Sequence, residues 1–219
     1  MSLFLGPIHH WLYNKIQVAS ERSLSIEDTF RHVFGEGAEP LLQEVDDMFP
    51  AFPTGLPLED IIGDSPIHTF LQGVIKMVET REGALLKLFV DKYGDKAGDV
   101  AYRVVREEGK RVGEKAKGEI ESNDPESIYR ALYDHQLDGM PCDQGASPEF
   151  KKNSVLIRQS ECLHGNNWKE AGAPLDVMCH ITSSWIKGFL EGAAPDLSCK
   201  IADSIIGGAN ECLFILEKK

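Results

Sequence analysis

The sequence predicts a chain of the α+β class, in which an N-terminal helical half packs on a small antiparallel sheet with a long crossing helix and a C-terminal β-hairpin. Two observations support this prediction. Apolar residues recur at helical spacing among charged ones up to about residue 120, and short β-branched runs replace that pattern after residue 150. We therefore expect a helical region over 1–123 and an α+β region over 124–219. The two are merged in one domain, because 219 residues can build one full core.

Three helices are expected before residue 49. The first begins at Pro7 and carries one apolar stripe, made of Ile8, Trp11, Leu12 and Ile16. Ser25 and Asp28 resemble a capping box, which predicts that a separate short helix begins there. A third helix begins near Pro40, and the proline-rich stretch 49–57 predicts a turn-rich connection.

Further helical segments follow this connection. Ser65 and Pro66 predict the cap and first turn of a helix that reaches about Gly94. The stretch 95–120 mixes charges of both signs around a few valines, which favours a solvated helix with salt-linked outer positions over a binding role. The stretch DPESIYRALYDHQL (124–137) is typical of a short capped helix.

The C-terminal third predicts strands and one helix. NSVLIRQSEC (153–162) is short and β-branched, so we expect a strand ending at Cys162. A helix begins at Pro174 and reaches about Leu190. SCKIADSII and ECLFILE flank GGAN, which predicts a hairpin with a loop at 207–210, so that Lys200 pairs with Glu217. In this register one face holds Ile201, Asp203 and Ile205 beside Cys212, Phe214 and Leu216.

Asp203 is the single acid on that otherwise apolar face. A carboxyl group removed from water there could act as a general base or bind a cationic ligand. The alternative is a position at the sheet margin, where water reaches the carboxylate. A one-residue bulge would turn the side chain to the other face, so both readings stay open.

Composition and charge exclude several classes of function. The formal net charge of −12 disfavours nucleic acid and anionic membrane surfaces as partners. No apolar run approaches the roughly 20 residues that span a bilayer. The first residues lack the basic start and small-residue cleavage site of a signal peptide, so we expect a cytoplasmic protein. Five cysteines are an odd number, which favours free thiols, metal ligands or a catalytic thiol over a disulfide framework.

Three of the candidate site residues lie within 159–180. Cys162 and His164 point to the same side if the strand continues, and Cys179 lies on the packed face of the following helix, whereas His180 turns away. A thiol near an imidazole can be a nucleophile–base pair. Cys162, His164 and Cys179 are also suitable ligands for zinc or iron, with one coordination position open. The alternative is that Cys162 is a small buried hydrophobe and His164 a loop residue.

A family resemblance adds to this interpretation. The order of strand and Cys162, loop, helix with Cys179, and a final hairpin with Gly208, Cys212, Phe214 and Leu216 resembles the C-terminal half of the 2-amino-thiazoline-4-carboxylate hydrolase-like proteins and the related 4-vinyl reductase domains. The resemblance covers roughly residues 150–219. It implies an α+β domain that usually forms dimers. It also implies a small-molecule pocket, in some members beside a cysteine-bound metal, with Cys162, Cys179 and Cys212 at the matching positions.

Three hypotheses for function follow. The first is a cytoplasmic, homodimeric protein that binds a small molecule or a metal ion in a pocket between the 174–190 helix and the C-terminal sheet. Its ligand-binding residues would be Cys179, Cys212, Phe214 and Trp185. The second is a hydrolase of small cyclic or amide substrates, in which Cys162 or a metal-bound water attacks and His164 or Asp203 moves protons. The third is a structural protein whose cysteines only pack.

Overall fold

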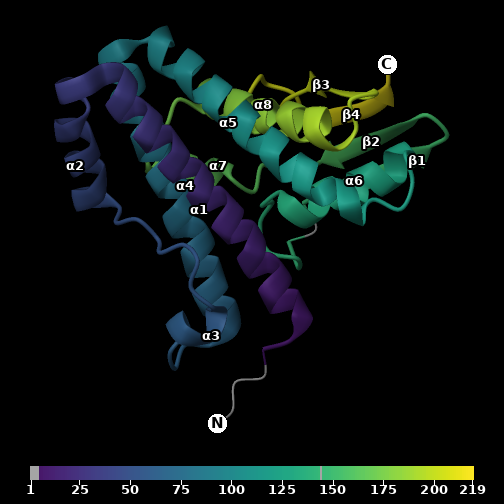
Figure 1. The fold of residues 1–219 in the computed structure, drawn as a ribbon, viewed down its shortest axis with the longest axis horizontal. Helices are drawn as coiled ribbons and strands as arrows, with labels where there is room; N and C mark the ends of the chain where they lie inside the picture. The colour runs from purple at the N-terminus through teal and green to yellow at the C-terminus, as the bar shows by residue number, and fades with distance from the viewer. Residues whose placement is uncertain (1–4, 144) are drawn as a thin grey trace.

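The computed structural model describes residues 5–143 and 145–219 and has the predicted α+β architecture (Figure 1). The N-terminal half is helical, with α1 (Pro7–Phe34), α2 (Glu39–Met48), α3 (Leu58–Ile61), α4 (Ile67–Tyr93) and α5 (Asp95–Ala116). Short 3-10 turns at Gly35–Gly37 and Lys117–Glu119 follow α1 and α5. The C-terminal half consists of α6 (Pro125–His135), β1 (Ser147–Lys151), β2 (Ser154–Gln159), α7 (Gly165–Glu170), α8 (Leu175–Ala193), β3 (Leu197–Asp203) and β4 (Cys212–Lys218).

Figure 1 shows how these elements are arranged. Helices α1 and α4 pack along each other and extend toward α3, while α5 packs along α8 beside the sheet. The larger apolar core lies between these helices and the sheet, and a smaller one lies between α1, α3 and α4. None of the described helices combines the length and the apolar run that a bilayer crossing requires.

The four strands form an antiparallel sheet in the order β1-β2-β4-β3. The sequence analysis missed β1, because its segment SPEFK is charged and exposed throughout. In contrast, Val155 on β2 and Leu216 on β4 pair with each other and are fully buried. Alternation of such residues turns one face of the sheet toward α8 and α6.

The first two predicted helices are in fact one. The apolar stripe that begins near Leu12 continues through Ile16, Ile26 and Phe30, all buried, so α1 runs unbroken for 28 residues. The hydroxyl of Ser25 donates to the carbonyl of Glu21, one turn earlier, instead of capping a new helix. The prediction of a helix start at Ser25 was therefore wrong.

The prediction of a solvated α5 was wrong for one of its faces. Gly109 and Gly113 on α5 are buried against the backbone of α8, and Gly188 and Gly192 on α8 are buried against the backbone of α5. A Cβ added at any of these four glycines would clash with the backbone of the facing helix. The helices can approach this closely only because these positions lack side chains. Beside this close contact, Arg106 of α5 pairs with Glu191 of α8.

The strands near the candidate site also differ in detail from the predictions. β2 ends at Gln159, so Cys162 lies in a turn rather than at the end of a strand. The hairpin is confirmed, and the Lys200 ammonium donates to Glu217 Oε1 over 2.7 Å as expected, but in the strand register Lys200 lies opposite Ile215. A bulge between Ile201 and Asp203 then exposes the Asp203 side chain, which is the second of the two positions considered for this acid.

Candidate functional site

A cavity lies between α8, α7 and the sheet, at the place where the sequence analysis expected a pocket. Three thiols line it, from Cys162, Cys179 and Cys212, together with Phe214, Ile201 and Trp168. We call it the thiol cavity. The volume that a water-sized sphere can enter is about 30 Å³.

Each thiol comes from a different element. Cys162 is in the turn before α7, Cys179 is on α8, and Cys212 is the first residue of β4. The backbone N–H of Ile205 donates to Cys212 Sγ over 3.3 Å, which ties the hairpin loop to the cavity wall. Burial raises the pKa of the Cys162 thiol, and burial together with the neighbouring thiols raises the pKa of Cys179 to about 11. Both thiols are therefore protonated at neutral pH, which makes them weak nucleophiles.

His164 lies between the thiol cavity and two carboxylates. Its Nδ1 is 2.6 Å from Glu79 Oε1, and its Nε2 is 3.5 Å from Asp138 Oδ1. Asn167 and Gln159 hold the other oxygens of these two carboxylates. Burial alone would lower the pKa of His164, but the charge and hydrogen bond of Glu79 and the charge of Asp138 raise it to about 9. The ring is therefore an imidazolium at neutral pH, with no lone pair for a proton or a metal ion.

A second cavity continues beyond His164 and has charged walls. Arg22 of α1 binds Glu82 of α4 with two hydrogen bonds of 2.7 Å, and Glu79 completes this wall. We call it the charged cavity. Its cations and carboxylates are matched in pairs, Arg22 with Glu82 and His164 with Glu79, which is the condition under which charges are stable away from water.

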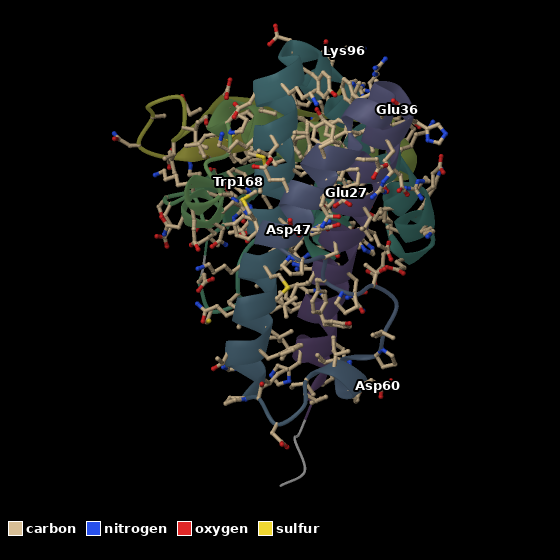
Figure 2. All side chains as sticks on the ribbon, turned by 90° about the vertical axis from the view of Figure 1, so that its left-hand side faces the viewer. Glu27, Glu36, Asp47, Asp60, Lys96 and Trp168 are labelled. Carbon is tan, nitrogen blue, oxygen red and sulfur yellow. The ribbon has the colours of Figure 1, made fainter. Side chains whose placement is uncertain are left out.

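Trp168 lines both the thiol cavity and the charged cavity. Only 4% of this residue is exposed, and its ring stacks on that of His164 with centroids 4.9 Å apart. Its buried indole N–H has no hydrogen-bond partner among the described residues. In Figure 2 the labelled Trp168 lies beside α4, which α7 contacts. A buried donor without an acceptor is rare in folded proteins, so it marks a position where a bound molecule could supply one.

The structure brings most of the predicted site residues together. Cys162, His164, Cys179, Cys212 and Phe214 all line the thiol cavity. Trp185 lines the charged cavity instead, and its indole N–H donates to Glu108. Asp203 lines neither cavity and is exposed on the bulged strand, so the structure does not place it among these residues.

The predicted metal and catalytic roles receive no support from the geometry. Within the residues that the structure describes, no group of three or more His, Cys, Asp or Glu side chains is arranged to hold a metal ion. Both ring nitrogens of His164 face carboxylates, and neither is bonded to Cys162. Zinc or iron at Cys162, His164 and Cys179, and a Cys162–His164 hydrolase, stay predictions.

Sequence reasoning missed the residues of the charged cavity. Glu79 and Glu82 lie within the run Glu-Thr-Arg-Glu in the middle of a long helix, and all four of these residues are buried. Four consecutive polar residues extend around a helix, so at least one must face the core. Such a run in the middle of an amphipathic helix was the available signal. The sequence gives no such signal for Arg22, because no residue near it in the chain indicates that its partner lies on α4.

Comparison with known proteins identifies no relative. No model of a protein family matches the chain, and neither the curated proteins nor the solved structures contain a match. The resemblance of residues 150–219 to the hydrolase-like proteins and 4-vinyl reductase domains therefore stays a prediction.

Proposed function

We propose that this protein binds a small uncharged molecule in the thiol cavity. The observation that carries the proposal is Trp168, a residue that lines the thiol cavity and whose buried indole N–H has no acceptor among the described residues. Leaving such a donor unpaired costs about 1–3 kcal/mol, and a ligand oxygen or nitrogen at hydrogen-bond distance would recover part of it.

The charge state of the walls supports an uncharged ligand. The pKa values of Cys162 and Cys179 are raised, so these walls carry no negative charge at neutral pH. The charged groups on the far side of His164 are already matched in pairs. A metal ion would have to displace protons from the thiols and from the imidazolium before it could bind, which makes it the less favoured occupant. The homodimer and the cytoplasmic location also stay predictions.

Binding can be tested with a library of uncharged small molecules, using ligand-observed NMR and calorimetry. Ser204 lines the thiol cavity from the hairpin loop, so Ser204→Trp should fill it and abolish binding of the hits. Ala202→Trp is the matched control, because Ala202 is exposed on the neighbouring bulge and lines no cavity described above. Trp168→Phe keeps an aromatic ring but removes the donor. It should weaken oxygen-bearing hits about 2- to 12-fold, the value of one net hydrogen bond.

Two results would contradict the proposal. One is a set of hits whose affinity is unchanged in Ser204→Trp, which would place them elsewhere on the protein. The other is a well-folded protein that binds no member of the library. Circular dichroism and thermal unfolding of each variant establish that the fold is retained.

A further inference from the structure

A groove at the surface lies between α6, the loop that follows this helix, and the edge strand β1 (Figure 1). We call it the surface groove. Its volume is about 540 Å³, whereas the thiol cavity offers about 30 Å³. Small-molecule sites in proteins usually measure roughly 300–1,000 Å³. The surface groove therefore has room for an organic molecule without any rearrangement of its walls.

Three aromatic side chains line the surface groove, Tyr129 and Tyr133 from α6 and Phe150 from β1. The ring centre of Tyr129 is 6.1 Å from that of Tyr133 and 5.8 Å from that of Phe150, so the three rings form one aromatic wall. Tyr133 is 37% exposed and Phe150 is 40% exposed. Tyr129 is only 8% exposed, and its hydroxyl forms no hydrogen bond with another described residue. Contiguous apolar surface of this kind marks a place where other molecules bind.

Two cations of the chain itself lie on the aromatic wall. Lys15 Nζ is 3.9 Å from the centre of the Tyr133 ring, and the Arg130 guanidinium is 5.4 Å from that of Phe150. The face of an aromatic ring carries partial negative charge and attracts cations. Lys15 is buried and is not part of the groove walls, and Arg130 is exposed. The exposed parts of Tyr133 and Phe150 are therefore available to a cation that comes from outside.

The charged residues of the groove walls include one carboxylate without a cationic partner. Arg130 forms an ion pair within α6, and Asp138 lies 3.5 Å from His164 Nε2. Asp134 accepts a hydrogen bond from an uncharged indole and forms no ion pair with another described residue. Its charge raises the pKa of Lys15, but only from beyond ion-pair distance. A cation in the groove would complement Asp134, and the net charge of −12 favours its approach.

We infer that the surface groove binds an organic ammonium ion, whose alkylated nitrogen packs on the aromatic wall while Asp134 balances its charge. Alkyl groups on the nitrogen bring apolar surface to Tyr133 and Phe150, which an inorganic cation cannot do. The neutral Tyr129 hydroxyl leaves an oxygen lone pair that can face the positive charge. This site is separate from the thiol cavity, and the inference does not depend on the proposed function.

NMR titration of the intact chain tests the inference with tetramethylammonium and choline as probes. Sodium chloride at equal ionic strength is the reference, because screening alone can move amide signals. Both probes should give saturable shifts in the amides of α6 and of 145–150. The neutral analogue 3,3-dimethyl-1-butanol has the shape of choline with carbon in place of nitrogen. It should bind at least about fivefold more weakly, because it lacks the charge that the rings and the carboxylate attract.

Two variants separate the contribution of the ring from that of the charge. Phe150→Leu keeps an apolar side chain but removes one ring, and it should weaken choline about 2- to 5-fold. Asp134→Asn keeps an oxygen that accepts from Trp11 but removes the negative charge, and it should also weaken choline about 2- to 5-fold. Asp47→Asn is the matched control, because Asp47 is exposed on α2, lies outside the groove walls and changes the net charge equally. Choline should bind this control as it binds wild type.

Three results would overturn the inference. The first is the absence of saturable shifts in α6 and 145–150 with either ammonium probe. The second is equal affinity for choline and its neutral analogue, which would show that charge plays no part. The third is an Asp134→Asn protein, folded by circular dichroism, that binds choline no more weakly than Asp47→Asn does. The library screen with Ser204→Trp decides the thiol cavity separately, so either proposal can fail while the other stands.

Discussion

Replacing Gly188 by alanine should destabilise the protein, because α8 lies too close to α5 for a side chain at this position. An ideal Cβ on Gly188 would lie 2.8 Å from the carbonyl carbon of Arg106 and 3.0 Å from its Cα. Backbone atoms cannot rotate aside as a side chain can, so the helices must separate. Overpacking costs about 1–3 kcal/mol, and we expect the upper end here. Alanine's higher helix propensity returns about 1 kcal/mol, which leaves a net loss of about 2 kcal/mol.

Urea denaturation followed by circular dichroism measures this loss, and Gly73→Ala is the matched control. Gly73 lies in α4 with no atom within 4 Å of an added Cβ, so the same substitution should stabilise the protein by about 1 kcal/mol. The two variants should thus differ by about 3 kcal/mol. A Gly188→Ala protein as stable as wild type, or two variants that shift equally, would refute the close approach of α5 and α8.

The remaining predictions concern pH. The pKa of His164 is raised from 6.5 to about 9, because Glu79 and Asp138 outweigh the opposing effect of burial. The stability that the folded protein gains from the protonated His164 is fully present below pH 6.5 and is lost as pH rises through 9. The free energy of unfolding of the wild type should therefore fall by about 3 kcal/mol across that window, and His164→Gln should remove this pH dependence. Burial raises the pKa of Glu108 from 4.5 to about 7, despite the opposing Arg22 and Trp185. The folded state then binds more protons than the unfolded state, so stability should fall by about 3 kcal/mol from pH 4.5 to 7. Glu108→Gln should flatten that part of the curve while the amide oxygen still accepts from Trp185. Urea denaturation at a series of pH values checks both, and a variant that retains the wild-type slope in its window would contradict the assignment.

The buried charges explain why the candidate site holds a defined shape. Glu79 receives hydrogen bonds from two residues of the α7 region, His164 and Asn167, and so ties α7 to α4. Arg22 and Glu82 tie α4 to α1 in the same way. Removing one partner of such a pair leaves an unpaired buried charge, which is far less favourable than replacing both. The site therefore depends on helices that are distant in sequence.

Local chemistry determined several parts of this protein directly from the sequence. Asp124 accepts from the backbone N–H of Ser127 and begins α6, as the capping pattern predicts. The face of α8 that carries Cys179 follows from helical periodicity, and His180 is exposed as expected. The hairpin follows from the alternation on both sides of its loop. Each of these features depends on residues that are close together in the chain.

Tertiary structure alone decided the rest, for reasons that lie between elements. Ser25 could have capped a helix, but continuous burial along α1 kept the helix intact. The bulge that exposes Asp203 arises from pairing between β3 and β4, which no single strand specifies. The thiol cavity brings together Cys162, Cys179 and Cys212 from three elements. The indole N–H of Trp168 is unpaired because none of the described residues that pack around it places an acceptor within reach. Local spacing sets which face of an element is apolar, but which charged group is buried, and beside which partner, depends on the packing of elements far apart in the chain.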